Sequence, residues 1–323
     1  MKIQFNITTS ECDLERYESS ADLESMMGSR FDGVELMCFE DDVRGIIRKE
    51  KVTGLHMTNI MHLYDFWRGD METLLRQFEK EENIIRHYGG LRHEDLIAKY
   101  KKDIENALKY EAEYVVFHVA SCTDEEEMAN VFNEDDFDVL DAHCELLNEL
   151  FPADWDGPRL LLENLWLPGF DFTKPDRTKY MLDHVNYKKK GIMLDTGHLM
   201  HTNLDLRDMD EAVEYVHQML DLHGDLCKYI KGVHLQGSVT GDIVKKAMKE
   251  YDGMPADYGE RNFKLFMYVF QVDRHKPFIA KGVKELIERI APDYLTFEFI
   301  SESREQHEGY LNEQWSVLEG LRR

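Results

Sequence analysis

The sequence predicts a single (β/α)8 barrel, an α/β fold, over residues 1–323. Short apolar segments rich in β-branched or aromatic residues alternate eight times with charged segments that have helical spacing. The apolar segments are almost continuously hydrophobic, which is typical of parallel strands buried on both faces. No linker divides the chain, so closure into one barrel is the economical architecture. A doubly wound open sheet is the alternative, but no Gly-x-Gly-x-x-Gly turn follows an early strand.

The strands are expected at eight positions along the chain. Their ranges are Lys2–Ile7, Gly33–Met37, Thr53–Met57, Tyr114–Val119, Arg159–Glu163, Gly191–Asp195, Ile230–Leu235 and Tyr294–Phe299. Amphipathic segments lie between them. In residues 135–151, for example, Phe137, Leu140, Cys144 and Leu147 recur at steps of three and four residues. This spacing predicts a helix with one apolar face.

Two connections between predicted strands are much longer than the others. They cover residues 58–113 and 236–293. In barrel enzymes, long segments above the carboxyl ends of the strands form lids and substrate pockets. We therefore expect two long loop insertions on the C-terminal face of the barrel.

The composition restricts the class of protein. The chain has 64 acidic and 39 basic residues, which gives a formal net charge of −25. Because such a charge repels polyanions, we do not expect nucleic acid as a partner. No apolar stretch is long enough for a membrane span, and the N-terminus reads as a strand rather than a signal peptide. The five cysteines form no paired-spacing motif, which favours a reduced, cytoplasmic protein.

Ligand-type side chains stand at or near the carboxyl ends of seven predicted strands. They are Glu35, His56, His118, Glu163, Asp195, His234 and Glu298. Because the strand ends of a barrel converge, we expect these residues to be neighbours. Crowded carboxylates raise one another's pKa values or require a cation. A polar network that caps the barrel is the alternative, and for Glu35 the alternative is an anchor for a neighbouring loop.

The ends of the last four strands carry three carboxylates and one imidazole, which together suit Mn²⁺, Mg²⁺, Co²⁺ or Zn²⁺. The expected metal ligands are Glu163, Asp195, His234 and Glu298. Further candidates for metal or substrate ligands are His56, His118, His198, Asp273 and His275. Aromatic faces pack against sugars, and arginine binds phosphate. The candidates for substrate binding are Trp67, Arg68, Trp166 and Arg274.

Several segments resemble the xylose isomerase-like TIM-barrel superfamily. They are Leu162-Glu163-Asn164, Leu194-Asp195-Thr-Gly-His198, Gly232-Val-His234-Leu, Asp273-Arg-His275 and Thr296-Phe-Glu298. This superfamily contains sugar and sugar-phosphate isomerases and epimerases, and also the apurinic endonuclease family. In the isomerase branch, the resemblance implies one divalent metal on the four expected ligands. It also implies that Glu163 and Glu298 are catalytic and move protons.

The endonuclease branch implies three zinc ions on nine residues, so one to three ions are expected. This sequence offers a candidate for each position in the right order: His56, His118, Glu163, Asp195, His198, His234, Asp273, His275 and Glu298. The insertion between His234 and Asp273 is longer than that branch leads us to expect, and we find no DNA-contacting loops. The resemblance therefore supports a multi-metal pocket more strongly than DNA repair.

Three functions are compatible with these residues. The first is a metal-dependent isomerase or epimerase of a small sugar or sugar derivative, in which Glu163 and Glu298 transfer a proton through an enediolate. The second is a multi-zinc phosphoester hydrolase, and the third is a barrel that binds a metal or sugar without turnover. The net charge favours the first. The expected partner is a small sugar or phosphorylated substrate. A homo-oligomer is a further expectation, based only on how common oligomers are.

Overall fold

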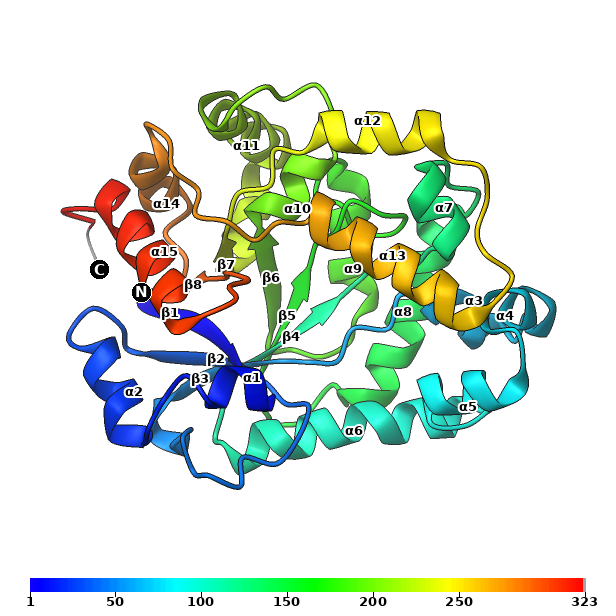
Figure 1. Ribbon diagram of the computed structural model, residues 1–323, viewed down its shortest axis with the longest axis horizontal. Coiled ribbons are helices and arrows are strands. Elements are labelled where there is room, and N and C mark those ends of the chain that lie inside the picture. Colours follow the sequence, from blue (N-terminus) through cyan, green and yellow to red (C-terminus); the bar gives the residue numbers. More distant parts are fainter. Residues whose placement is uncertain (322–323) are drawn as a thin grey trace.

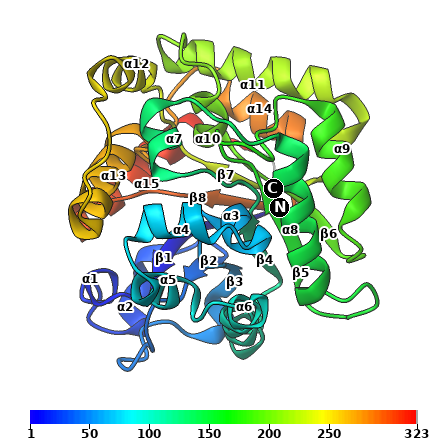
Figure 2. The ribbon, with the colours of Figure 1, turned by 90° about the vertical axis from the view of Figure 1, so that its right-hand side faces the viewer.

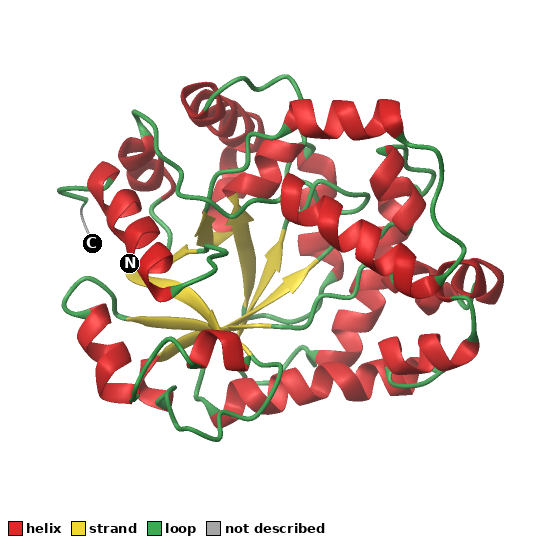
Figure 3. Cartoon of the chain, viewed as in Figure 1, coloured by secondary structure: helices red, strands yellow, loops and turns green. Residues whose placement is uncertain are grey.

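Eight parallel strands pair in chain order, and the last strand pairs with the first, so that the sheet closes into a barrel (Figure 3). The computed structural model describes residues 1–321. The strands are β1 (Lys2–Thr8), β2 (Gly33–Met37), β3 (Val52–His56), β4 (Tyr114–His118), β5 (Arg159–Glu163), β6 (Lys190–Asp195), β7 (Ile230–Leu235) and β8 (Tyr294–Phe297). The predicted (β/α)8 barrel is confirmed.

Helices surround the strands on all sides (Figure 2). The helices are α1 (Glu11–Leu14), α2 (Ser20–Met27), α3 (Leu63–Arg68), α4 (Met71–Phe78), α5 (Glu81–Tyr88), α6 (His93–Lys109), α7 (Asp124–Ala129), α8 (Asp136–Leu150), α9 (Pro175–His184), α10 (Thr196–His201), α11 (Met209–His223), α12 (Gly241–Glu250), α13 (Tyr258–Val272), α14 (Val283–Ile290) and α15 (Arg304–Val317). Two short 3₁₀ helices are η1 (Lys49–Lys51) and η2 (Gly224–Tyr229). The described part of the chain contains no helix that is long and apolar enough to cross a bilayer.

The predicted helix over residues 135–151 is α8. The side chain of Asp135 accepts a hydrogen bond of 2.8 Å from the backbone N–H of Phe137, which satisfies one of the free donors at the start of the helix. Leu140, Cys144 and Leu147 are buried, as the apolar spacing predicts. This helix therefore packs by the face that its sequence marks.

The two long connections differ from the prediction, because helices rather than loops fill most of them. Residues 58–113 form α3 to α6, and α6 packs against β3 and β4. Residues 236–293 form α12, α13 and α14, and Figure 1 shows α12 and α13 beside α7. Within these connections, apolar residues recur at the spacing of an amphipathic helix. The length of a connection alone does not show whether it forms a helix or a loop.

Several strand ends also differ by one or two residues from the predicted positions. The largest difference is at β8, which ends at Phe297, so Glu298 lies just beyond the strand. The backbone N–H of Phe299 donates a hydrogen bond of 2.9 Å to the side chain of Asn6, which replaces the ladder there. Side-chain competition for backbone groups is a common reason why a strand ends.

A small apolar cluster fills the interior of the barrel below the strand ends. It consists of Tyr114, Val116, Leu161, Met193 and Tyr294. The ring of Tyr114 lies directly over Gly54, its partner in the register between β3 and β4. A Cβ atom at this glycine would lie 2.0 Å from Cζ of the tyrosine. Only glycine fits under this ring.

We predict that Gly54→Ala destabilises the barrel. Tyr114 is fully buried and its hydroxyl is held by hydrogen bonds, so the ring cannot move aside at low cost. The free energy of unfolding should fall by about 1–3 kcal/mol in urea denaturation. Gly309→Ala in α15 is the control, since nothing lies within 4 Å of its added Cβ. That variant should be neutral or stabilised by about 0.5–1 kcal/mol. Equal stability of both variants would contradict the tight contact.

Candidate metal centre

A cavity of about 450 Å³ opens at the carboxyl ends of the strands. Its lining combines ligand-type side chains with apolar ones: Asn6, Ile7, Thr8, Glu35, Met37, Phe39, His56, Asn59, His118, His198, Phe270, Asp273, His275, Glu298 and Ile300. All nine residues that the sequence offered as metal ligands lie at or directly beneath this cavity. Three groups, in each of which the ligand atoms lie within 4.8 Å of one another, include all nine, and a fourth group, His56, His234 and Glu298, overlaps the first two.

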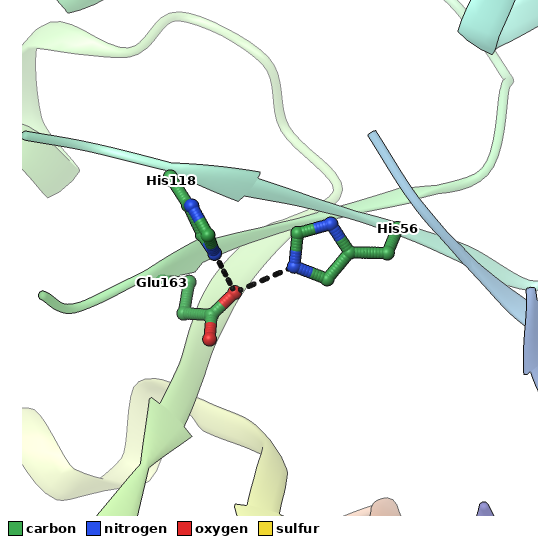
Figure 4. Close-up of side chains that lie close together, drawn as sticks. All are labelled: His56, His118 and Glu163. Atoms are coloured by element: carbon green, nitrogen blue, oxygen red, sulfur yellow. Dashed lines mark hydrogen bonds and ion pairs between the residues drawn. The ribbon is translucent and has the colours of Figure 1, made fainter. Parts of the chain in front are cut away.

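The first group brings together the ends of β3, β4 and β5. His56 Nε2 lies 3.2 Å from Glu163 Oε2, and His118 Nε2 lies 3.0 Å from the same oxygen. Figure 4 shows both imidazole rings directed at this carboxylate. The register pairs His118 with Glu163 on neighbouring strands, so their side chains meet on the same face of the sheet.

The second group shares Glu163 and adds the ends of β6, β7 and β8. The other carboxylate oxygen, Glu163 Oε1, lies 2.9 Å from His234 Nδ1. The same nitrogen lies 3.2 Å from Glu298 Oε2 and 3.9 Å from Asp195 Oδ2. Each oxygen of Glu163 therefore faces a different set of imidazoles. This is the arrangement in which one carboxylate can bridge two metal ions.

The third group lies above the strand ends, with His198 in α10 and with Asp273 and His275 in the loop after α13. Asp273 Oδ2 lies 3.3 Å from His198 Nε2 and 2.7 Å from His275 Nε2. Asp273 follows directly after α13, which brings the long connection over the strand ends. His275 has a positive φ of 44°, a conformation that costs free energy for a non-glycine residue. Such strain often occurs where a side chain must be held in a functional position.

The segment Asp195-Thr-Gly-His198 has a local geometry that turns two side chains toward the cavity. Asp195 is the N-cap of α10, and its Oδ1 accepts a hydrogen bond of 2.6 Å from the backbone N–H of His198. His198 Nδ1 lies 2.9 Å from the carbonyl oxygen of Asn164, so its Nε2 is the atom that faces Asp273. Gly197 is required between them, since its Cβ would lie 2.0 Å from the side chain of Gln236.

Burial and charge shift the pKa values of this cluster in opposite directions. Burial alone would raise the pKa of Glu163, but His234 and His118 outweigh it and hold that pKa well below its usual value. For Glu298, burial outweighs the two nearby histidines and, with help from Glu163, raises the pKa to about 7. Burial would lower the pKa of His275, yet Asp273 and Glu298 raise it to about 9. In the metal-free cluster, protons therefore occupy positions that a cation would take.

The donor set fits divalent metal ions. Glu163, Asp195 and Glu298 are at most 7% exposed. Within residues 1–321, Asp195 Oδ2 and Glu298 Oε2 are buried and accept no hydrogen bond. Buried carboxylate oxygens without donors are costly unless a cation binds them. Carboxylate oxygens together with imidazole nitrogens suit Zn²⁺, Mn²⁺ or Co²⁺.

Two of the predicted substrate contacts lie outside the cavity. Trp67 and Arg68 belong to α3, and both donate hydrogen bonds to Glu145 on α8, at 2.7 and 2.9 Å. The Trp67 ring also stacks on His93, with centroids 4.1 Å apart. These contacts join helices on the outside of the barrel. The prediction that this pair binds substrate is corrected, because their segment is a helix that faces its neighbours.

The other two predicted substrate contacts, Trp166 and Arg274, lie nearer to the cavity but do not line it. The Trp166 ring is 5.3 Å from His198 and 4.7 Å from His201, so it packs behind the third group of ligands rather than lining the cavity. Arg274 is exposed, and its backbone N–H donates to Ser238 at 3.0 Å. Its side chain does not line the cavity, although it stands between two predicted ligands.

Two further residues, Glu35 and His201, contact candidate metal ligands, although neither had a definite role in the site predicted from the sequence. Glu35 Oε1 lies 2.8 Å from His234 Nε2, on the opposite side of the ring from the carboxylates of the second group. His201 Nε2 lies 3.5 Å from Asp273 Oδ1. The position of Glu35 at a strand end was a usable signal. The spacing of His201, one helical turn after His198, was a second usable signal, but His201 was not among the predicted site residues.

Glu35 is itself held by a chain of hydrogen bonds through the barrel interior. Its Oε2 accepts from the hydroxyl of Tyr114 at 2.5 Å and from that of Thr296 at 3.0 Å. The side chain of Gln4 donates to both of these hydroxyl oxygens, to that of Thr296 at 3.0 Å. A carboxylate behind a ligand histidine fixes the orientation of the ring and raises its basicity. The sequence alone assigned this carboxylate no partner.

Comparisons with known proteins agree with the fold. A family model described as "Xylose isomerase-like TIM barrel" matches residues 31–310, and no curated protein matches the chain. Endonuclease IV from Thermus thermophilus is similar with a TM-score of 0.51 and 14% identity over 99% of both chains. The 3-keto-D-glucoside 4-epimerase YcjR from E. coli gives 0.50 and 14% over 98% of this chain and 99% of the other. A D-tagatose 3-epimerase-like protein gives 0.48 and 16% over 98% of each. At these identities the structural matches show the fold alone.

We predict that the metal-free protein loses stability as the pH rises from 7 to 9. Burial, together with Asp124, raises the pKa of Glu127 to about 8, and Glu298 and His275 titrate near 7 and 9. Groups whose pKa is raised in the folded chain stabilise it at low pH, and that contribution is lost as the pH rises through the folded pKa. In EDTA, the free energy of unfolding should fall by about 4 kcal/mol across this window, mostly from His275 and Glu127, since most of the contribution of Glu298 is lost below pH 7.

Saturating Zn²⁺ should remove the part of this fall that comes from Glu298 and His275, because the metal replaces protons on the ligands, and should leave the part that comes from Glu127. His275→Asn is the matched control, and in EDTA its stability should depend less steeply on pH than that of the wild type. A metal-free wild type that is equally stable at pH 7 and pH 9 would contradict the assigned protonation states.

We further predict that Glu35→Gln weakens metal binding by about tenfold, because the neutral side chain no longer supports His234. Competition with a chelator of known affinity measures the change. Tyr114→Phe is the milder companion variant, since it removes one hydrogen bond to Glu35 but leaves its charge. Unchanged metal affinity in Glu35→Gln would show that the carboxylate serves only to pack the barrel.

Proposed function

The chain belongs to the xylose isomerase-like TIM-barrel family, and from this premise we propose that it is a metal-dependent hydrolase of a small phosphoester. The family includes both sugar-converting enzymes and endonucleases, so membership alone does not select the reaction. The selection rests on the ligand cluster of this chain.

The observation that carries the proposal is the position of Glu163 between two sets of imidazoles. One oxygen faces His56 and His118, and the other faces His234. A single metal on the second group would leave the first and third groups without a metal-binding role. Two or more ions held close together are the arrangement that phosphoester hydrolysis uses.

When bound, such ions would activate a water molecule and neutralise the charge that develops on the phosphoryl oxygens. The residues of the chain would hold these ions and orient the substrate. Glu163 would serve as a ligand in both the first and the second group, while Asp273 would fix His198 and His275 in the third. Glu35, behind His234, would keep the ring in the tautomer whose Nδ1 faces the metal.

A small phosphoester is a better substrate than DNA for this chain. The net charge is −25, and no lysine or arginine among the described residues lines the cavity. Proteins that bind nucleic acid rely on such side chains to contact the phosphates. We therefore propose a substrate that presents one phosphoryl group to the metal ions.

The second candidate is the isomerase or epimerase that the sequence favoured. The observation in its favour is that Glu163 and Glu298 both approach His234 Nδ1, at 2.9 and 3.2 Å. Two carboxylates on either side of one metal position can take a proton from a sugar carbon and return it. This reaction needs only the second group of ligands.

Metal stoichiometry distinguishes the two candidates. Protein purified without a metal-affinity step should contain two or three metal ions per chain, mostly zinc, by elemental analysis. His275→Ala should lose one ion and most of the hydrolysis of bis(p-nitrophenyl) phosphate, because the third group loses a ligand. His184→Ala is the control, since that histidine is exposed at the end of α9.

One ion per chain, unchanged in His275→Ala, would contradict the hydrolase. Together with conversion between aldose and ketose sugars, that result would establish the second candidate.

A further inference from the structure

We propose that the substrate carries an uncharged, apolar group, of which a phenyl ring is the simplest example, and that Phe39, Phe270 and Ile300 bind it. The inference rests on the metal centre proposed above and adds a substrate class to it. The reactive end of the substrate would lie at the ligand groups, and the apolar group against the rim of the same cavity.

The lining of the cavity is divided between two kinds of side chain. The ligand-type residues of the lining are Glu35 on β2, His56 and His118 at the ends of β3 and β4, His198 in α10, Glu298 after β8, and Asp273 and His275 after α13. The rest of the lining, from the end of β1, the end of β2, α13 and the segments that follow β2, β3 and β8, is mostly apolar. Its apolar members are Ile7, Met37, Phe39, Phe270 and Ile300, and its polar members are Asn6, Thr8 and Asn59. A substrate that reaches the ligands therefore touches this mostly apolar part.

Three of these side chains are exposed although they are hydrophobic. The exposed fraction is 60% for Phe39, 45% for Phe270 and 38% for Ile300. Covering such surface with an apolar group removes it from water and is favourable. Isolated exposed apolar residues are ordinary, but a group of them at the mouth of a polar site is typical of a ligand pocket.

The backbone around this rim is fixed by buried polar groups. The hydroxyl of Thr9 accepts hydrogen bonds from the N–H groups of Phe39 and Glu40, at 2.9 and 3.0 Å. The N–H of Ile300 donates to the carbonyl oxygen of His275 at 3.2 Å. The rim and the ligands are thus parts of one rigid frame, as binding without a large ordering cost requires.

The charges around the cavity argue against a second anionic group on the substrate. Apart from histidine, the ionisable side chains in the lining are Glu35, Asp273 and Glu298. An adjoining cavity of about 260 Å³ shares Phe39, Phe270 and Ile300 and includes Arg16. The charge of that guanidinium is balanced by Asp13 at 3.1 Å, and the group also donates to the carbonyl oxygen of Ser301 at 2.6 Å. The part of the substrate beyond the metal ions is therefore neutral.

The experiment compares two metal-binding probes whose head group is the same whatever the natural reaction is. Benzohydroxamate and acetohydroxamate differ only in a phenyl ring and a methyl group. Isothermal titration of the zinc-loaded protein should give about tenfold tighter binding for the phenyl compound. Phe39→Ala and Phe270→Ala should each reduce this ratio by about threefold or more, with unchanged metal content.

Phe263→Ala is the matched control, because Phe263 lies on the same helix, is 67% exposed and does not line the cavity. It should keep the wild-type ratio. Equal binding of the two probes to the wild type would overturn the inference. So would a ratio that falls equally in Phe263→Ala, or the failure of both probes to bind.

A phenyl preference without any phosphoester hydrolysis would support the inference and remove only the proposed reaction. The two proposals can therefore fail separately.

Discussion

The burial of the Glu163 carboxylate is the constraint on which the rest of the site depends. This side chain is 0% exposed, and an unpaired carboxylate at such a position would cost several kcal/mol. Its charge is balanced by His56, His118 and His234, which come from three other strands. The barrel must therefore close with one particular register between these strands. Fold and site share this requirement, because the same side chains satisfy the charge and form the ligand groups.

Residues at successive depths of the barrel hold the side chains around Glu163 in place. The ligands stand at the strand ends, and beneath them Glu35 supports His234 from within the barrel. Below that, Tyr114 and Thr296 donate to Glu35, and the ring of Tyr114 rests on Gly54. Each layer fixes the orientation of the one above it. The contact between the Tyr114 ring and Gly54 therefore contributes to the position of a candidate metal ligand.

The sequence predicted the fold and the ligand groups because both follow from short-range patterns. Apolar runs indicate the strands, and the polar residues at the ends of these runs indicate which side chains converge on the pocket. It did not predict which side chain pairs with which. Glu35 and His234 are far apart in the chain, so nothing local revealed their contact. Trp67 and Arg68 are close together in the sequence, but their residue types occur both in amphipathic helices and in loops that line a pocket. The sequence therefore does not show whether these two side chains face the cavity or a neighbouring helix. In the structure, the direction of α3 turns both toward α8.

The charge of −25, which argues against nucleic acid as a partner, does not argue equally against a small anionic substrate. Among the described residues, neither lysine nor arginine lines the cavity, so the protein itself offers an anion only imidazolium groups held beside carboxylates. A phosphoryl group would be repelled from the metal-free site. Bound cations would reverse the local potential. In the proposed hydrolase, metal and substrate binding would therefore be thermodynamically coupled, and each would strengthen the other. An acidic chain is thus compatible with a phosphoester substrate, provided that the positive charge comes from the metal ions.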